Sequence, residues 1–450
     1  MNRRIRNRTY GGVREQIKIY CALHVIFIFL LDLTDSYKMK HGYLIFLLAL
    51  TAGLLPGHAM WAGKVSAQPL AYSSPEEMGM DRNQLMRVDS LILDAVKSEI
   101  TPGAVLVVVR DSVIVYENAW GWTRRVPELQ NMQTSTIFDL ASLTKPLATA
   151  TAAMKLVEDG RLRLTDPISK YVPEFARFGG EDLPLRDQPR IIHLLTHTAG
   201  LPSYAPVREL KRAFGDEAGD NLMTHLCALP DRAVPGTEMT YSCPSFITLQ
   251  QVVEAVTGTD LHSWTRDNLY APLGMDETFF LPIGEPVDLE TLDRIAPTVY
   301  NRREGVIAGI VHDPLAREVM GGISGNAGLF STAGDLAVFA AMMLNDGVIN
   351  GKRILSPATV RTMTTAPAGF EPFGRALGWD LASSFASNQG DLFGRNTYGH
   401  TGYTGTSMVL DPDTRTAVIL LTNRVYPDDT TSVVDLRAKV ATVVAASILE

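Results

Sequence analysis

The residues Ser142-Leu143-Thr144-Lys145 place a serine and a lysine three positions apart at the start of a predicted helix. The residues that follow, 146–157, are mostly Ala, Thr, Leu and Met, and we expect the helix to end near Asp159-Gly160, where glycine is a stop signal. On a helix, residues i and i+3 share a face, so the lysine amine lies beside the serine hydroxyl. A serine is a poor nucleophile until a base accepts its proton, and a desolvated lysine can be that base. Such a pair also arises by chance in a long chain, so the downstream motifs decide its meaning.

The composition is that of an ordinary globular protein. The chain has 450 residues, of which 46% are hydrophobic and 20% charged, which is ample material for a core. The net charge of −8 offers no basic surface for nucleic acid, so we expect no nucleic-acid partner. No Pro/Ser-rich linker or charge block divides the chain after residue 70, which favours one domain with a large insertion.

The N-terminal region has the pattern of a targeting segment. Two apolar runs, Ile19–Leu31 and Tyr43–Leu55, are both short for a membrane span. Met39-Lys40-His41 is typical of the charged start of a signal peptide, and Val65-Ser66-Ala67 is typical of a cleavage site. We therefore interpret residues 1–67 as an extension and signal peptide, with translation starting at Met39.

This interpretation leaves residues 68–450 as the mature domain and predicts export to the periplasm or the cell exterior. The alternative is a genuine membrane anchor in the N-terminal segment, which would be the only part that contacts a membrane. No cysteine lies near the cleavage site, which disfavours a lipidated N-terminus. After cleavage Cys227 and Cys243 remain, and their spacing does not decide whether they pair.

Strand patterns occur at both ends of the mature chain. Residues 103–109 are a β-branched run typical of a buried strand, and residues 113–116 return as the second strand of a hairpin. Near the other end, residues 406–410 and 417–421 flank a turn at Asp411-Pro412-Asp413. Helical patterns cover residues 81–98, 246–256, 333–344 and 433–449.

These patterns predict an α+β fold in which one antiparallel sheet is built from both ends of the chain and is flanked by helices. The sheet region is expected over residues 75–163 and 379–450, with a helical lobe over residues 164–378. A cleft between sheet and lobe is a natural place for chemistry.

Two further motifs supply groups for acyl transfer. Tyr241-Ser242-Cys243 precedes a helix, and a tyrosine near a lysine ammonium is pushed towards phenolate, a usable base. His400-Thr401-Gly402 stands at the start of a predicted strand, where the glycine lets a substrate backbone approach closely. The amide of Tyr403 can pair with the amide of Ser142 as an oxyanion hole.

In this order, Ser142-x-x-Lys145, Tyr241-x-Cys243 and His400-Thr401-Gly402 resemble the motifs of the serine β-lactamase and penicillin-binding-protein superfamily. More specifically, they resemble the branch with class C β-lactamases, DD-peptidases, D-aminopeptidases and family VIII esterases. The resemblance covers roughly residues 75–450. Other stretches typical of that branch are Leu194–Leu201, Pro272–Met275, Gly328–Leu336 and Gly399–Gly402.

The resemblance implies a β-lactamase/transpeptidase-like fold and a role for each motif. Ser142 would be the nucleophile, Lys145 would lower the proton affinity of its hydroxyl, and Tyr241 would relay protons to the leaving group. His400 would bind a substrate carboxylate or orient Tyr241. Thr401, Gly402 and Cys243 are expected to contact the substrate.

Two residues depart from the family pattern. Cys243 stands where the family has Asn or sometimes Asp, and a thiol donates and accepts hydrogen bonds only weakly. This disfavours efficient β-lactam or peptide turnover. Members with histidine at the position of His400 are often esterases or D-aminopeptidases.

We therefore expect an exported serine hydrolase that forms an acyl-enzyme with an ester or an amide. The substrate would be a small-molecule ester, an amide or a D-amino-acid peptide, so carboxylesterase, D-aminopeptidase, DD-peptidase and weak β-lactamase activities are all open. No cofactor and no metal is needed. The alternative is a catalytically weakened relative that binds cell-wall fragments or peptides through the same cleft.

Some residues that fit catalytic or metal motifs have simpler interpretations. Tyr116-Glu117-Asn118 matches the tyrosine-x-asparagine pattern but precedes Ser142, so we interpret it as hairpin surface. His193 and His197 have the spacing of metal ligands, but the glutamate of a zinc-protease motif is replaced by Leu194, and we assign His197 to a structural turn.

Other candidates stay open. Asp139 is either a helix cap or a catalytic acid. Gly321–Asn326 is glycine-rich and is expected to form a loop beside the cleft. Trp379 and Tyr403 either line the substrate pocket or pack.

Overall fold

The computed structural model describes residues 70–230, 233–301 and 305–449. Residues 66–450 form one compact unit. The extension and signal peptide predicted over residues 1–67 lie outside the described residues, so export stays a prediction. Within the described part, no helix is both long and apolar enough to cross a membrane.

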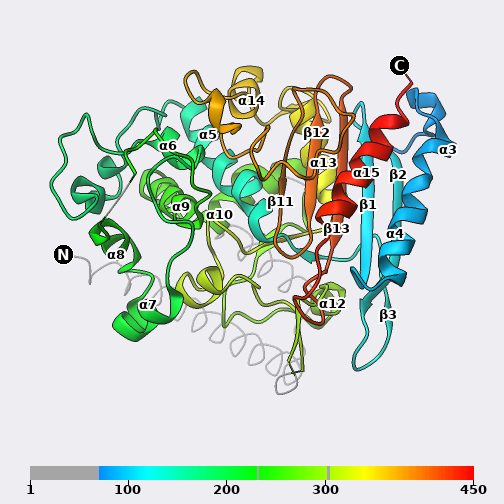
Figure 1. The fold of residues 1–450 in the computed structure, drawn as a ribbon, viewed down its shortest axis with the longest axis horizontal. Helices are drawn as coiled ribbons and strands as arrows, with labels where there is room; N and C mark the ends of the chain where they lie inside the picture. The colour runs from blue at the N-terminus through cyan, green and yellow to red at the C-terminus, as the bar shows by residue number, and fades with distance from the viewer. Residues whose placement is uncertain (1–69, 231–232, 302–304, 450) are drawn as a thin grey trace, which may run out of the picture. The chain divides into compact units, whose positions relative to one another are not determined.

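A six-stranded antiparallel sheet combines strands from both ends of the chain, as Figure 1 shows. The strand order is β11-β12-β13-β1-β2-β3. Leu106 pairs with Leu420, so the first long strand lies beside the last one. This confirms the predicted α+β fold with its shared sheet. The strands are β1 (Gly103–Arg110), β2 (Val113–Arg124), β3 (Gln130–Asn131), β11 (Tyr398–Thr401), β12 (Ser407–Asp411) and β13 (Thr416–Thr422).

Every residue of β1 is buried, and its alternate side chains point to opposite faces of the sheet. One face packs in a cluster with α4 (Arg87–Lys97) and α15 (Val434–Ala446), which lie side by side across the sheet (Figure 1). The other face packs against α13 (Ala333–Leu344). Helix α13 lies within the range expected for the helical lobe, but it is part of the covering of the sheet.

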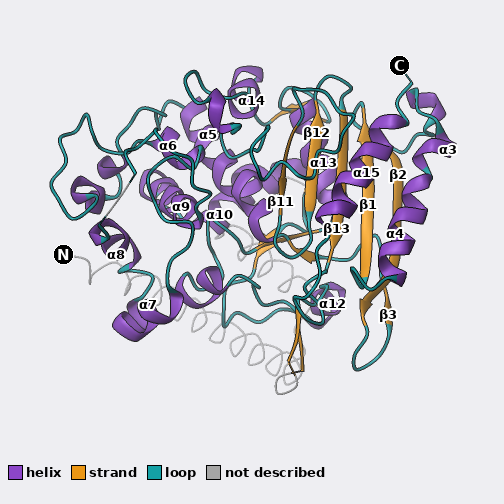
Figure 2. Cartoon of the chain, in the orientation of Figure 1, coloured by secondary structure: helices purple, strands orange, loops and turns teal. Residues whose placement is uncertain are grey.

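The middle of the chain holds most of the remaining helices and four short strand pairings (Figure 2). Before this middle region come α3 (Arg82–Leu85) and α5 (Thr151–Glu158), and within it lie α6 (Ile191–Leu195), α7 (Val207–Phe214), α8 (Leu222–Ala228), α9 (Cys243–Thr257), α10 (Leu261–Thr265), α11 (Ala271–Leu273), α12 (Leu289–Arg294) and α14 (Pro357–Thr364). The short strands are β4 (Phe138–Asp139), β5 (Phe279–Phe280), β6 (Val299–Asn301), β7 (Gly305–Ile307), β8 (Leu329–Ser331), β9 (Val348–Ile349) and β10 (Lys352–Arg353).

The helix that carries Ser142 and Lys145 begins irregularly. A 3₁₀ turn, Ala141–Leu143, is followed by a π-helical turn, Lys145–Ala150, before α5 starts. Pro146 has no amide hydrogen to donate, and the Thr151 hydroxyl donates to its carbonyl at 2.7 Å. The predicted helix therefore exists, with irregular first turns at the serine and the lysine.

Candidate active site

Ser142 and Lys145 lie side by side, as their spacing predicts. Lys145 Nζ donates to Ser142 Oγ over 2.9 Å and to the Asn326 carbonyl over 2.9 Å. The same nitrogen lies 3.6 Å from Cys243 Sγ. An ammonium group has three hydrogens, and these three neighbours accept all of them.

The charge of Lys145 follows from its surroundings. The side chain is fully buried, and burial by itself lowers the pKa of the amine. Electrostatic interactions with Cys243 and Tyr241 act in the opposite direction and raise the pKa of Lys145 above its ordinary value. Lys145 is therefore an ammonium at neutral pH. Of the two roles considered for it, this favours stabilising negative charge on Ser142 Oγ over accepting its proton.

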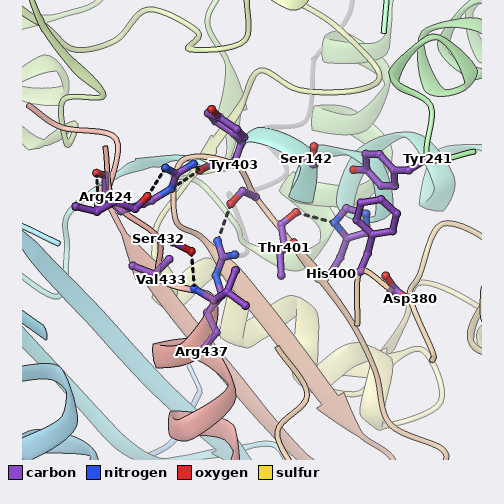
Figure 3. A pocket seen from close by; sticks show the side chains of 14 residues that line it. Ser142, Tyr241, Asp380, His400, Thr401, Tyr403, Arg424, Ser432, Val433 and Arg437 are labelled. Atoms are coloured by element: carbon purple, nitrogen blue, oxygen red, sulfur yellow. Dashed lines mark hydrogen bonds between the residues drawn. The ribbon is translucent and has the colours of Figure 1, made fainter. Parts of the chain in front are cut away.

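Tyr241 lies beside Lys145 and close to two histidine rings. Lys145 Nζ is 5.0 Å from the centre of the Tyr241 ring. The ring centres of His197 and His400 are 4.5 and 6.0 Å from that of Tyr241. Figure 3 shows the hydroxyl end of Tyr241 directed towards Ser142, which places it for proton exchange with the serine.

His197 fixes the segment that carries Tyr241. Its Nδ1 accepts a hydrogen bond from the Ser242 amide, and its carbonyl accepts one from the Thr240 amide, both over 3.0 Å. Its φ of +59° lies in the left-handed region, which fits the structural turn we predicted. Burial lowers the pKa of His197 well below its ordinary value, so the ring is neutral.

The candidate metal ligands do not come together in a metal site. His193 Nδ1 accepts a hydrogen bond from the Arg190 amide. Across the described ranges, no three His, Cys, Asp or Glu side chains gather where they could hold a metal ion.

His400 and Thr401 lie at the end of β11, which corrects the prediction that they start a strand. His400 Nδ1 is 2.9 Å from the Thr401 carbonyl, which can only accept, so Nδ1 carries the hydrogen. Burial, together with Arg375 and Lys145, lowers the pKa of His400 well below its ordinary value. The ring is therefore neutral, and its Nε2 has no hydrogen-bond partner among the described residues. A neutral ring offers no charge to a substrate carboxylate, which favours the orienting role.

The turn between β11 and β12, residues 402–406, is fastened to the backbone just before Ser142. Thr404 Oγ1 donates to the Asp139 carbonyl over 2.7 Å, and Thr406 Oγ1 donates to the Leu140 carbonyl over 2.9 Å. A Cβ on Gly402 would lie 2.3 Å from the Leu140 oxygen. Glycine is thus required by packing inside the protein, a reason that differs from the substrate approach we predicted. These contacts hold the Tyr403 amide beside the Ser142 turn.

Two cavities open at Ser142, and both are also lined by Tyr241 and Tyr403. The smaller cavity, of about 310 Å³, is shown in Figure 3 and has several polar residues in its wall. The larger cavity, of about 870 Å³, is mainly apolar. Its apolar lining includes Val299, Ile307, Ile310 and Val311. Ser142 therefore stands between a more polar and a more apolar part of the site.

The other predicted contacts are divided between the two cavities. Cys243 lines the larger one, and burial raises the pKa of its thiol. Thr401 and Gly402 line the smaller one. No disulfide joins Cys227 and Cys243.

The structure also shows where the residues with two open interpretations lie. Asp139 accepts hydrogen bonds from the amides of Ala141 and His312, both over 2.8 Å, so its carboxylate joins the backbone before Ser142 to that of His312. Trp379 is buried and packs against Tyr398, whereas Tyr403 lines both cavities.

Two predictions about loops and strands are confirmed. The Gly321–Asn326 loop lies beside the cleft, since the Asn326 carbonyl contacts Lys145. Tyr116 is in strand β2, where its hydroxyl donates to Asp89, so the Tyr116-Glu117-Asn118 motif belongs to the hairpin.

Sequence reasoning missed two buried arginines at the site. Arg375 is fully buried, pairs with Asp380 over 2.8 Å, and has its guanidinium carbon 5.8 Å from the centre of the Tyr241 ring. Arg437 reaches the 402–406 turn from α15. Neither belongs to a local motif, and only the packing of distant segments brings them to the site.

Comparisons with known proteins place the chain in a family. The family described as Beta-lactamase matches residues 88–442. A Salmonella agona protein named "Putative D-alanyl-D-alanine carboxypeptidase" is 33% identical over 399 residues, which cover 83% of this chain and 90% of that protein. A protein of the same name from Escherichia coli O157:H7 is 34% identical over 377 residues, with 79% and 86% covered.

Solved structures show the same fold. EstCE1, described as a hydrolase with promiscuous acyltransferase activity, has a TM-score of 0.64 at 24% identity and covers 81% of this chain and 99% of its own. The simvastatin synthase LovD from Aspergillus terreus has a TM-score of 0.64 at 22% identity, with the same coverage of 81% and 99%. With the family match and the curated relatives, these findings identify the chain as a member of the β-lactamase family of serine hydrolases.

Proposed function

We propose that the protein hydrolyses carboxylic esters through an acyl-enzyme on Ser142. The observation that carries the proposal is the 2.9 Å contact between Lys145 Nζ and Ser142 Oγ, at the point where two cavities meet. A buried ammonium at this distance stabilises the serine oxygen as it loses its proton.

In the proposed reaction, Tyr241 is the proton acceptor for Ser142, with the Lys145 ammonium beside it. Ser142 Oγ attacks the ester carbonyl carbon while its proton passes to Tyr241. The amides of Ser142 and Tyr403 stabilise the resulting oxyanion. The carbon–oxygen bond to the alcohol then breaks, and Tyr241 returns the proton to the leaving alkoxide. Water attacks the acyl-enzyme by the same route, and the free acid leaves Ser142 restored.

Features of the site favour esters over amides and β-lactams. The Cys243 thiol replaces an amide that would donate to and accept from a peptide substrate. His400 is neutral and cannot form a charge pair with a terminal carboxylate. The larger cavity suits an aliphatic or aromatic group on one side of the ester bond.

A second candidate is cleavage of a terminal D-alanine. It is supported by the name of the relatives that are 33% and 34% identical over most of this chain. We further propose that residues 1–67 direct the protein out of the cytoplasm, on the charge and cleavage-site pattern of that segment.

The test is intact-protein mass spectrometry of the wild type and Ser142→Ala, with product release followed in parallel. The probes are a series of p-nitrophenyl esters, a penicillin, and an N-acyl-D-Ala-D-Ala peptide. We expect fast nitrophenol release and an acyl adduct only in the wild type. Faster release of D-alanine than of nitrophenol would favour the second candidate. Equal rates in the two proteins on every probe would overturn the hydrolase proposal and leave a binding role for the cleft.

A further inference from the structure

We infer that Arg437 is a positioning residue for the oxyanion hole, because it holds the Gly402 carbonyl and so aims the Tyr403 amide at the substrate. The inference rests on the proposed function, since an oxyanion hole acts only if Ser142 attacks a carbonyl. It assigns a function to a buried cation that the proton-transfer steps do not use.

Arg437 lies on α15 and is 7% exposed. Its Nη2 donates to the Gly402 carbonyl over 2.6 Å and to the Thr406 carbonyl over 2.8 Å. Figure 3 shows its guanidinium directed at this turn. No acidic side chain of the described residues forms an ion pair with it, and its buried Nε has no partner there. Burying such a cation is costly, so its placement against two carbonyls calls for an explanation.

The direction of one carbonyl decides the direction of the next amide. A trans peptide unit is planar, and its C=O and N–H point to opposite sides. The Gly402–Tyr403 peptide is trans, so an arginine that holds the Gly402 oxygen directs the Tyr403 N–H away from α15. The Tyr403 amide donates to no main-chain carbonyl of the described residues, whereas the Gly402 amide donates to Thr406 over 2.7 Å. The Tyr403 N–H is thus held in direction and left available.

The charge of Arg437 adds to this geometry. Burial lowers the pKa of Arg437 to about 9, so the group is still a cation at neutral pH. A cation on the oxygen of a peptide polarises the whole unit and makes its N–H a stronger donor.

A neighbouring arginine provides a contrast. Arg424 holds the following carbonyl, that of Tyr403, over 2.6 Å, but it is paired with Asp429. Its charge is offset by that carboxylate, whereas Arg437 has no carboxylate partner among the described residues and lies at the wall of the smaller cavity.

The test compares Arg437→Met, which keeps the length and removes the charge, with Arg437→Lys, which keeps the charge. Lys439→Met is the matched control, because Lys439 lies on the same helix with an exposed side chain. Each protein is assayed with a p-nitrophenyl ester and with the thionoester in which sulfur replaces the carbonyl oxygen. Sulfur accepts hydrogen bonds poorly, so the ratio of the two rates reports the oxyanion hole.

We expect Arg437→Met to lose on the order of 10²-fold in kcat on the oxygen ester, with KM little changed and a much smaller loss on the thionoester. Arg437→Lys should recover only part of the loss and leave about a 10-fold change in the ratio, and Lys439→Met should behave as the wild type. Equal losses on both esters, or no loss, would overturn the inference.

The two proposals fail separately. A wild type whose ester turnover does not depend on Ser142 would refute the proposed function. Turnover that requires Ser142, with an unchanged ester-to-thionoester ratio in the Arg437 variants, would refute only this inference. Where Arg437→Met does not fold, Arg437→Lys decides, because a lysine reaches one carbonyl only and should shift the same ratio about 10-fold.

Discussion

The two sides of Ser142 are built in opposite ways. On the helix side, the groups of Lys145 and Tyr241 that face the serine are side chains. On the sheet side, the proposed oxyanion-hole donor is a main-chain amide, that of Tyr403, and the hydroxyls of Thr404 and Thr406 donate to main-chain carbonyls inside the protein. A substitution on the helix side therefore removes a reactive group, whereas one on the sheet side displaces a group that remains present.

The largest effect is expected from removing the cation on the helix side. Lys145→Met should lower kcat/KM for a p-nitrophenyl ester on the order of 10³-fold, because Ser142 Oγ loses the charge that stabilises it. Lys155→Met, in helix α5, is the control and should leave the rate unchanged. Thermal unfolding should show that Lys145→Met is folded, since replacing a buried charge by an apolar group is often tolerated. A loss in kcat/KM of less than tenfold would show that the Lys145 charge matters little, and the contrast between the two sides of Ser142 would fail.

A displacement on the sheet side should have a smaller effect. Gly402→Ala would place a Cβ 2.1 Å from Thr406 Oγ1 and 2.3 Å from the Leu140 oxygen, so the turn must move. We expect a loss on the order of 10²-fold in kcat, as for one oxyanion-hole donor. Gly334→Ala is the control, because its new Cβ would have its nearest contact at 3.9 Å. Full activity in Gly402→Ala would show that the amide can move without consequence.

The third prediction concerns the departure from the family pattern at Cys243. Cys243→Asn should raise the rate on an amide relative to an ester by about 10-fold, the equivalent of one added hydrogen bond. Cys227→Ala is the control, because it removes a buried thiol elsewhere and should leave the amide-to-ester ratio unchanged. An unchanged amide-to-ester ratio would mean that the thiol is not what disfavours amides.

The smallest effect is expected in the pH dependence of stability. His197, on the helix side, and His400, on the sheet side, both have pKa values well below the ordinary value. Below pH 6.5 both histidines become protonated in the unfolded chain but stay neutral in the folded chain. The free energy of unfolding therefore decreases as the pH falls. Each histidine should lower the free energy of unfolding by about 1 kcal/mol between pH 6.5 and 5.5.

Urea unfolding at the two pH values tests this on His197→Asn and His400→Asn. Each variant should lose less stability than the wild type over the interval, by a similar amount on the two sides. If either variant lost as much free energy of unfolding between the two pH values as the wild type, the corresponding histidine ring would not be held neutral.

The comparison also explains what the sequence could predict. The Ser142–Lys145 contact follows from helical geometry, in which residues three positions apart share a face, so their spacing in the sequence is sufficient to predict it. Asn326 acts through its carbonyl, which every residue has, so no side chain marks it. Strand β11 has the sequence Tyr-Gly-His-Thr, without a β-branched run, so the sequence pattern places His400 at the start of a strand, whereas it lies at the end of one. Arg437 reaches its turn only after α15 has packed on the sheet.

The pairing of β1 with β13 has a consequence for the synthesis of the protein. Leu106 leaves the ribosome long before Leu420, its partner in the sheet; at about 5–20 residues per second the interval is roughly 15 to 60 s. During that time the apolar edge of β1 has no neighbour on that side, and unpaired edges invite association with other chains. The 402–406 turn is also synthesised late. Until then the nascent chain contains Ser142 but lacks the Tyr403 amide, the proposed oxyanion-hole donor. Hydrolytic activity therefore begins only when the last strands have been made.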